Sequence, residues 1–311
     1  MPASLWYRTA ALFGSLSIAL ALPAVQAEPV LRLPFHLDGA SLPVLSLELG
    51  GARQVFHLDT SSLEALHLDR ALLANIPGLT LSAEKRRSTD LTGKVYLDDR
   101  FRIARLDVDG LRFDNVDGVT LTPWGKTLSP DGHLPSTMAI GLGLFKDKAL
   151  LIDYRQRQLS VAAQARPLII GQTGWIDLPL QLTEEGVVLH MAQGAGRYDL
   201  ILDTGASLSV LFKQAGARPF TPLAACQTLL AGLDFSGCQA TTLHFAEPGL
   251  ERLSLGAMVL DGDYGHLDMH GLLGSNFFEH FAVLLDFPGE RLLIRPYPPA
   301  APARVAQSPD R

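Results

Sequence analysis

Residues 200–207, LILDTGAS, place an aspartate between an apolar run and a turn of small residues. A similar arrangement occurs earlier in the chain, where residues 57–62 read HLDTSS. An aspartate at the end of an apolar strand is anchored by buried neighbours, while its carboxylate lies at the edge of the core. A single motif of this kind arises easily by chance, so its significance depends on whether the surrounding sequence is also repeated.

The sequence around each motif is repeated. Residues 44–60 (VLSLELGGARQVFHLDT) align without a gap with residues 188–204 (VLHMAQGAGRYDLILDT), and both end in Leu-Asp-Thr. Residues 140–161 align with 273–294 and share 6 identities over 22 positions, against about one or two expected by chance. Because the two alignments follow one another in the same order, we predict a tandem duplication with lobes at residues 28–165 and 172–297.

Both predicted lobes have the pattern of β-structure. Short apolar or alternating runs, separated by Gly, Asp and Pro, predict strands at 45–49, 55–58, 101–108, 187–191, 200–202 and 282–286. Helical periodicity is confined to residues 63–73 and to the segments after Gly141 and Gly274. We therefore expect an all-β fold of two related β-barrel lobes with short helices, and a proline-rich, disordered tail at residues 298–311.

The composition excludes some partners and indicates export. The net charge is -6 and the longest basic run is the triplet at residues 85–87, which gives no electrostatic footprint for nucleic acid. Residues 1–27 place Arg8 before an apolar stretch and end in Val-Gln-Ala, as a cleaved signal peptide does. The apolar stretch is shorter than the roughly 20 residues that span a bilayer. We expect a periplasmic or secreted protein without stable membrane insertion after cleavage.

Cys226 and Cys238 are the only cysteines in the chain. In an oxidising compartment, an even pair at this spacing is most simply a disulfide. The two cysteines have no nearby histidine pair and therefore make a poor zinc site. We predict a structural disulfide between them.

Taken together, these features resemble the retropepsin-like aspartic proteases in their exported bacterial form, here as two tandem lobes in a pepsin-like arrangement. The family pattern is apolar-apolar-Asp-Thr-Gly, a flap hairpin, apolar-apolar-Gly and a closing strand. The second half matches it with LILDTGAS, a flap candidate at 229–245, GLLGSNFF and VLLDFPGERLLI, and the first half follows the same order with a flap around 92–102. The resemblance implies acid-protease-like lobes with a cleft between them, and an aspartic endopeptidase that cleaves an extended polypeptide.

The resemblance also assigns the site residues. Asp59 and Asp203 would be the catalytic pair: two adjacent carboxylates do not easily ionise together, so one activates water while the other protonates the peptide carbonyl. Thr60 and Thr204 would brace the two loops from behind, and the amides of Ser61 and Gly205 would hold the carboxylates. Neither a cofactor nor a metal is required. The expected form is a monomer that binds a polypeptide substrate.

Ser61 departs from the family pattern, in which glycine is the rule. If its position requires a conformation or a close approach that only glycine allows, the pair would be distorted. The alternative is then a pseudoprotease that acts as a periplasmic peptide-binding or scaffolding protein. A further alternative is that the second half forms an active pair with another copy of itself.

Other candidate residues have simpler interpretations. Asp153 and Asp286 occur where the family has a structural acid in its closing hairpin. His266 and His270 have a spacing that suits a metal on a helix, but they lie in a loop-like stretch before Gly271. We therefore expect no metal site here.

Overall fold

Apolar residues at every second position, or in continuous runs, form the strands of the computed structural model, which describes residues 28–91, 93–123, 136–213, 224–225 and 239–298. In β1 (Leu31–Leu37), Leu31, Leu33 and Phe35 are buried and the residues between them are exposed, the period of a strand with one face on a core. All six residues of β20 (Phe281–Asp286) are buried, as expected of a strand covered on both faces.

The first half of the described chain is built from strands and two one-turn helices. They are β1, β2 (Pro43–Leu49), β3 (Ala52–Asp59), β4 (Leu66–Leu68), α1 (Arg70–Leu73), β5 (Leu79–Thr89), β6 (Val95–Val108), β7 (Leu111–Thr120), β8 (Met138–Gly141), the 3-10 helix η1 (Leu142–Phe145), β9 (Ala149–Asp153) and β10 (Gln158–Ala162).

The second half repeats this composition after a short helix. Its elements are α2 (Arg166–Ile169), β11 (Ile176–Pro179), β12 (Gln181–Thr183), β13 (Gly186–Gln193), β14 (Gly196–Leu202), β15 (Val210–Lys213), β16 (Ala224–Ala225), β17 (Gln239–Phe245), β18 (Ser254–Asp261), β19 (Gly271–Leu273), α3 (Ser275–Phe278), β20 and β21 (Arg291–Pro296). The all-β organisation predicted from the sequence is confirmed.

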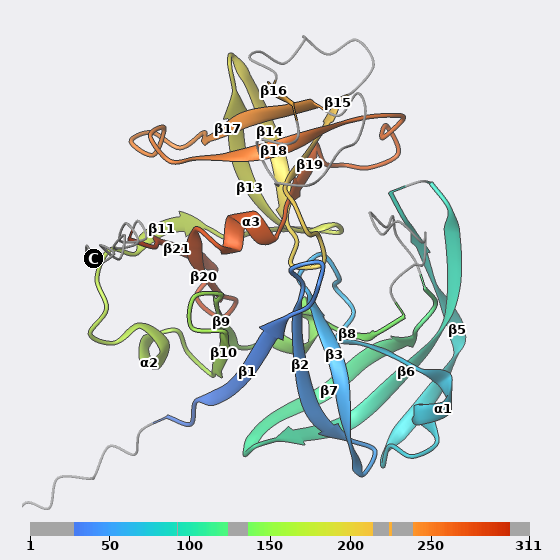
Figure 1. Cartoon of the computed structure of the whole chain (residues 1–311). Coiled ribbons are helices and arrows are strands. Elements are labelled where there is room, and N and C mark those ends of the chain that lie inside the picture. The colour runs from blue at the N-terminus through green and yellow to red at the C-terminus, as the bar shows by residue number, and fades with distance from the viewer. Residues whose placement is uncertain (1–27, 92, 124–135, 214–223, 226–238, 299–311) are drawn as a thin grey trace, which may run out of the picture.

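The two halves have the same strand pairing. In the first, β3 runs parallel to β8, while β4 runs antiparallel to β8 and parallel to β7. In the second, β14 runs parallel to β19, while β15 runs antiparallel to β19 and parallel to β18. Figure 1 shows the two strand units, one above the other, joined by the strands around β9 and β20. The duplication seen in the sequence is therefore also a duplication of topology.

Strands from both halves form one continuous sheet where the units meet. β9 pairs antiparallel with β20, and Leu151 lies opposite Leu284 in this pair. These two leucines are also matched in the repeat alignment, so the first copy of the strand lies against the second with local twofold symmetry. β10 and β21 extend this sheet on either side, and β11 ends it.

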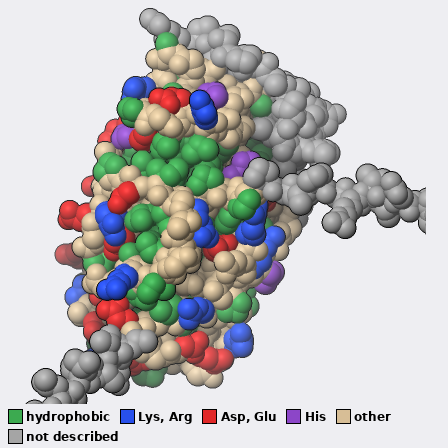
Figure 2. All heavy atoms as spheres, turned by 90° about the vertical axis from the view of Figure 1, so that its left-hand side faces the viewer, with side chains coloured by type: hydrophobic (Ala, Val, Ile, Leu, Met, Phe, Trp, Pro, Cys, Tyr) green, Lys and Arg blue, Asp and Glu red, His purple; other side chains and the backbone are tan. Residues whose placement is uncertain are grey.

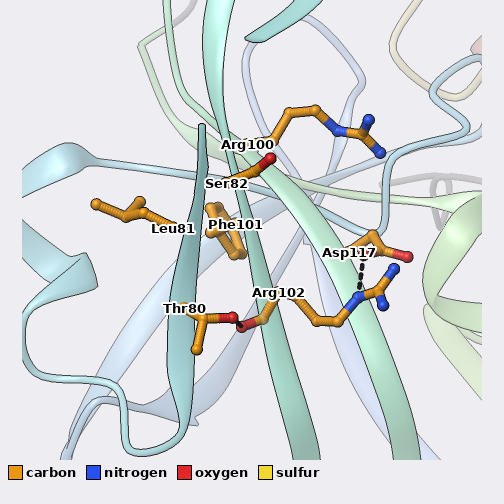
Figure 3. A pocket seen from close by; sticks show the side chains of 7 residues that line it. All are labelled: Thr80, Leu81, Ser82, Arg100, Phe101, Arg102 and Asp117. Atoms are coloured by element: carbon orange, nitrogen blue, oxygen red, sulfur yellow. Dashed lines mark hydrogen bonds and ion pairs between the residues drawn. The ribbon is translucent and has the colours of Figure 1, made fainter. Parts of the chain in front are cut away.

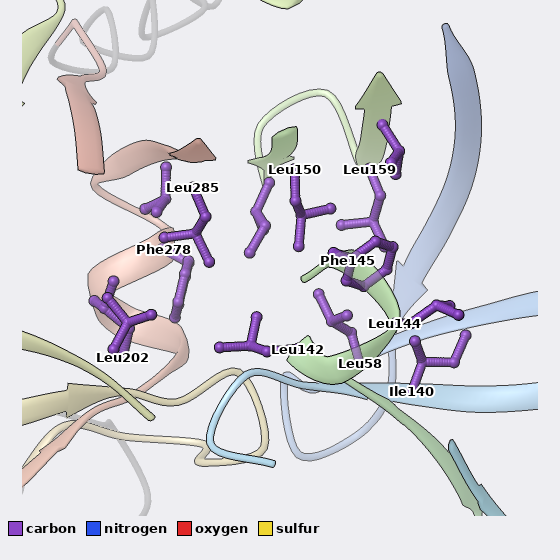
Figure 4. Packing of buried hydrophobic residues seen from close by; sticks show 14 of the residues in the cluster. Leu58, Ile140, Leu142, Leu144, Phe145, Leu150, Leu159, Leu202, Phe278 and Leu285 are labelled. Carbon is purple, nitrogen blue, oxygen red and sulfur yellow. The ribbon is translucent and has the colours of Figure 1, made fainter. Parts of the chain in front are cut away.

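The halves also share a core. One cluster of buried residues contains Leu58 and Leu142 from the first half and Leu202 and Phe278 from the second, and Figure 4 shows these side chains facing the same interior. Leu58 and Leu202 directly precede the two aspartates and are fully buried. Each fully buried leucine contributes roughly 1.5–3 kcal/mol relative to an exposed one. The packing that joins the halves therefore also anchors both aspartate loops.

The helix predicted over residues 63–73 is wrong in most of its length. Only Arg70–Leu73 is helical, as α1, while Leu66–Leu68 forms β4 between β7 and β8. Leu66 and Leu68 are buried and His67 is partly exposed, so these three residues show the alternation of buried and exposed side chains that is typical of a strand. Pairing with two neighbouring strands outweighs the local helical preference.

The predicted flap of the first half is larger than residues 92–102. It is the hairpin β5–β6, in which Thr89 pairs with Val95 and Leu79 pairs with Ile103. From Thr80 to Thr89, β5 is exposed throughout, so it lacks the apolar alternation that marks a strand in sequence. Its pairing with the half-buried β6 is what makes it a strand.

Several predictions lie partly or wholly outside the described residues. These are the signal peptide at 1–27, Cys226 and Cys238, most of the tail at 298–311, and the first part of the flap candidate at 229–245, of which only β17 is described. Among the helices that are described, none has the length and apolar character needed to cross a membrane.

Candidate active site

The two predicted aspartates lie at the ends of equivalent strands. Asp59 is the last residue of β3, and Asp203 directly follows β14. Asp59 pairs with Gly141 of β8, and the Asp203 amide donates a hydrogen bond of 2.9 Å to the carbonyl of Leu273 in β19. The parallel neighbour strand therefore fixes the position of each aspartate in its sheet.

A glycine at the end of each neighbour strand allows the chain to pass behind the aspartate loop. A Cβ at Gly141 would collide with the carbonyl of Glu64, and one at Gly274 would collide with the backbone of Leu208. These are backbone contacts that cannot move aside cheaply. This explains why both halves carry apolar-apolar-Gly at this point.

The threonines that follow the aspartates cross-brace the two halves. The Thr60 amide donates to Thr204 Oγ1 at 3.1 Å, and the Thr204 amide donates to Thr60 Oγ1 at 3.0 Å. Each hydroxyl then donates to a carbonyl of the other half at 2.7 Å, Thr60 to Leu202 and Thr204 to Leu58. All four bonds are buried, so the two aspartate loops are held in one fixed relation within a single chain.

The carboxylates of Asp59 and Asp203 face the same small volume. The Ser61 amide donates to Asp59 Oδ1 at 3.0 Å, and the Gly205 amide donates to Asp203 Oδ1 at 2.8 Å. A Cβ placed on Gly205 would lie 3.1 Å from Asp203 Oδ1 and 3.3 Å from Asp59 Oδ1, so a single methyl group there would touch both carboxylates. Each aspartate is only 7% exposed. The structure thus brings the two repeated acids together in a buried pair.

Ser61 fits its position in the first motif without a glycine conformation. Among the described residues other than glycine, positive φ occurs only at Ser41, Asp109, Asn115, Arg157 and Glu290. The Ser61 hydroxyl instead donates to Asp59 Oδ1 at 2.7 Å. The serine therefore adds a hydrogen bond to the pair and causes no left-handed strain.

The environment of Asp203 favours the protonated form of its carboxyl. Burial, together with the nearby charge of Asp59, raises the pKa of Asp203 to about 7, while hydrogen bonds from the Gly205 amide, the Ser61 side chain and the Ala206 amide act in the opposite direction. Loss of solvation and a like charge both penalise the ionised form. Asp203 therefore holds a proton at mildly acidic pH.

The shifted pKa makes stability depend on pH at this residue. The unfolded chain ionises Asp203 near its ordinary pKa of 3.8, while the folded chain keeps the proton until about pH 7. The contribution of protonated Asp203 to the stability of the folded state is fully present below pH 3.8 and is lost as the pH rises through 7. Asp203→Asn should therefore be more stable than the wild type by about 2–4 kcal/mol at pH 7.5 and about equal at pH 3.5.

Denaturant unfolding at the two pH values measures this difference. Asp114→Asn, at an exposed position of β7, is the control and should show no comparable change with pH. A stability difference for Asp203→Asn that is the same at both pH values would contradict a buried, protonated Asp203.

A contact between Ser62 and His67 holds the loop of the first motif and was not predicted from the sequence. Ser62 Oγ and His67 Nε2 of β4 are 2.7 Å apart. Burial lowers the pKa of His67, and the charges of Asp59 and Glu64 act in the opposite direction. His67 thus favours its neutral form while its ring is held beside the loop that carries Asp59.

The tip of the β5–β6 hairpin contacts the second half. His266 Nε2 donates to the carbonyl of Asp90 at 3.2 Å, and Leu91 packs against the cluster that contains Val210 and Leu272. The Tyr96 hydroxyl donates to Asp90 Oδ2 at 2.8 Å and fixes the turn from the inside. The hairpin therefore reaches from the sheet of one half to that of the other, the position expected of a flap.

The remaining sequence candidates have structural partners. His266 faces the hairpin, whereas His270 Nδ1 accepts from the Asp199 amide, so the two rings serve different contacts. Asp153 accepts from the Tyr297 hydroxyl at 2.8 Å, and Asp286 accepts from Arg291 at 3.2 Å. Within the described residues, no group of three His, Cys, Asp or Glu side chains is arranged to hold a metal ion.

A surface hollow lies on the hairpin itself. It has a volume of about 310 Å³ and is lined by residues of β5, β6 and β7, including Leu81, Phe101 and the ion pair of Arg102 with Asp117. Figure 3 shows these side chains around it, and neither Asp59 nor Asp203 is among them. On another face of the molecule, Figure 2 shows acidic and basic side chains interspersed with hydrophobic ones.

Comparisons with known proteins agree with the architecture. No family model and no curated protein sequence matches the chain. Among solved structures, basic 7S globulin from soybean is similar with a TM-score of 0.56 and 11% identity, covering 86% of this chain and 95% of the globulin. Conglutin gamma from lupine seeds is similar with a TM-score of 0.53 and 10% identity, covering 86% and 95%. The aspartic proteinase from Irpex lacteus is similar with a TM-score of 0.54 and 12% identity, covering 86% and 97%.

At this level of identity the similarity concerns the fold. The neighbours include one protein named as an aspartic proteinase and two named as basic 7S globulins. Because one architecture carries different functions, function has to be argued from the site. The chain has an acid-protease-like all-β fold.

Proposed function

We propose that this protein is an aspartic endopeptidase that hydrolyses an extended polypeptide with Asp59 and Asp203 as its catalytic pair. The observation that carries the proposal is the buried pair itself: two carboxylates from repeated motifs face one volume, and one of them has its pKa raised to about 7. A carboxyl that keeps its proton beside a second carboxyl can act as a general acid while its neighbour acts as a general base.

The geometry supports a division of roles between the two acids. Asp59, ionised, removes a proton from a water molecule, whose oxygen attacks the peptide carbonyl carbon, while Asp203 gives its proton to the carbonyl oxygen. In the second step the C–N bond breaks: Asp59 passes its proton to the leaving nitrogen, and a hydroxyl of the intermediate returns a proton to Asp203. One water is consumed and the pair recovers its single proton.

The proposed substrate is an extended peptide segment. A segment of this shape hydrogen-bonds through its main chain to strands that flank it and places alternate side chains in pockets. The aspartates are 7% exposed and the β5–β6 tip contacts the second half, and we propose that the hairpin lifts when a peptide binds. We further propose that the protein acts as a monomer in the periplasm or outside the cell, after removal of residues 1–27.

The alternative is a pseudoprotease that binds peptides without cleaving them. The observation that favours it is the Ser61 hydroxyl, which lies 2.7 Å from Asp59 Oδ1, where it competes with a water molecule for that carboxylate.

Cleavage of a diverse peptide mixture by the protein lacking residues 1–27, from acidic to neutral pH, separates the two functions. We expect hydrolysis that pepstatin inhibits and that declines as the pH rises through about 7, because Asp203 then loses the proton that it must donate. Peptide binding without hydrolysis at any of these pH values would favour the pseudoprotease.

A further inference from the structure

The tip of the β5–β6 hairpin is a closed turn organised around Asp90. The Gly93 amide donates to the Asp90 carbonyl at 2.9 Å, and the Lys94 amide donates to Asp90 Oδ1 at 3.2 Å. The Tyr96 hydroxyl donates to Asp90 Oδ2 at 2.8 Å, and Asp90 is buried. Gly93 has a φ of 81°, which glycine adopts without steric cost. These contacts within the hairpin give its tip a defined shape.

The second half contacts this tip with one polar and one apolar surface. His266 Nε2 donates to the Asp90 carbonyl at 3.2 Å, and the histidine ring lies against the turn, since a Cβ on Gly93 would be 3.8 Å from His266 Cε1. Leu91 packs against the apolar cluster of the second half that contains Val210. Figure 1 shows the hairpin rising from the first half toward the second. The tip is therefore carried by one half and seated on the other.

The loop that carries His266 is anchored on both sides of the histidine. Before it, the buried Tyr264 ring stacks on Phe212 of β15, with ring centroids 4.2 Å apart and an angle of 12° between the planes. After it, the Asp268 amide donates to Glu185 Oε1 at 3.4 Å, in the turn between β12 and β13. The second half therefore presents His266 to the hairpin from a defined position.

The apolar surface under Leu91 adjoins the loop of Asp203. Ala206, three residues after Asp203, is partly buried against the same cluster that receives Leu91. Ile201, two residues before Asp203, belongs to this cluster and is fully buried. The hairpin tip thus rests on the apolar residues that also support the loop of Asp203.

We propose that His266 and the cluster under Leu91 form a latch, which holds the β5–β6 hairpin closed in the free protein and is broken when a peptide binds. An extended peptide inserted between the tip and the second half moves His266 Nε2 and the Asp90 carbonyl, now 3.2 Å apart, beyond hydrogen-bond reach. The link to catalysis rests on the proposed function, in which the hairpin lifts for a peptide. The latch itself is a property of the free protein.

A latch of this kind lowers the apparent affinity for a peptide. Only molecules with an open hairpin bind, so the apparent dissociation constant is the intrinsic constant divided by the open fraction. While the closed form predominates, removing the hydrogen bond from His266 should raise the open fraction about two- to tenfold, the range expected for one intramolecular hydrogen bond. The same factor should appear in the exchange of the free protein and in the binding of a peptide.

Amide hydrogen exchange of the protein without any peptide tests the latch directly. In His266→Ala, exchange at the hairpin tip and in the loop around residue 266 should be about two- to tenfold faster, while the base of the hairpin, where Leu79 pairs with Ile103, should be unchanged. Leu91→Ala, which loosens the latch from the other side, should act in the same direction. His266→Gln keeps a donor nitrogen near the position of Nε2 and should retain the wild-type exchange. His36→Ala, exposed on β1, is the control.

The sign of the change in affinity separates a latch from a contact that helps to hold the peptide. If the latch competes with the peptide, His266→Ala should bind pepstatin about two- to tenfold more tightly and lower KM by the same factor, with kcat little changed. Weaker binding in His266→Ala, or unchanged exchange at the tip of the free protein, would overturn the proposal. If the wild type neither hydrolyses peptides nor binds pepstatin, the proposed function fails, and the exchange measurement still decides whether the latch exists.

Discussion

Asp203→Asn should lower the turnover of peptide hydrolysis at least about a hundredfold. Asparagine keeps the size of the side chain and an oxygen that can accept from the Gly205 amide, as Asp203 Oδ1 does at 2.8 Å, but it cannot supply the acidic proton. General acid–base catalysis by one positioned group is worth about 10²–10⁴ in rate. The Michaelis constant should change little, since the peptide contacts remain.

Asp59→Asn should give a loss of the same order, and the double variant should lose little more than either single one. After either change, the remaining carboxyl has no partner with which to divide the roles of acid and base, so the effects do not add. Asp199→Asn, which removes a half-exposed acid of β14 paired with His190, is the control for a general effect of removing an acid from the strand that leads to Asp203. Full activity in both Asp59→Asn and Asp203→Asn would refute the mechanism.

The aspartate pair can be predicted from the sequence because the chain is duplicated. The repeat places Leu58-Asp59-Thr60 and Leu202-Asp203-Thr204 at equivalent positions of the two halves. Equivalent strand ends can meet where two halves with the same strand pairing pack together. The pairing of Leu151 with Leu284 shows the same relation in the joining sheet. Residues that matter in both halves leave a signal that one sequence can reveal.

Features that occur in only one half leave no such signal. The contact of Ser62 with His67 has no counterpart in the second half, where Ala206 replaces the serine. The second half is braced instead by Asn276, which accepts from the amide and hydroxyl of Ser209, each at 2.7 Å. Each half therefore supports its aspartate loop with different side chains, and comparison of the repeats cannot show them.

Structure that depends on pairing between strands is also hard to predict locally. β5 is exposed from Thr80 to Thr89 and gains its regular backbone from β6, with a register shift between Leu81 and Lys85. β4 is three residues long and is defined by its two neighbours. In both cases the residues alone carry too little apolar periodicity, because what selects the strand is a partner distant in sequence.

The threonine brace should make a large contribution to stability near the pair. Thr204→Val keeps the branched shape but removes the hydroxyl that accepts from the Thr60 amide and donates to the Leu58 carbonyl. Both hydrogen bonds are buried, so Thr204→Val leaves the Thr60 amide and the Leu58 carbonyl without these partners, and each unsatisfied group costs about 1–3 kcal/mol. We expect Thr204→Val to lower the free energy of unfolding by about 3–5 kcal/mol.

Matched variants test whether the loss of the Thr204 hydroxyl causes the loss of stability. Thr204→Ser retains the hydroxyl and loses one methyl group, so chemical denaturation should show a loss of only about 1 kcal/mol. Thr242→Val, at an exposed position of β17, should be close to neutral. Thr60→Val together with Thr204→Val should cost less than the sum of the two, because the hydrogen bonds are reciprocal. If Thr204→Val is no less stable than Thr204→Ser, the reciprocal bonds contribute little, and the two loops must be held together by the shared core around Leu58 and Leu202 instead.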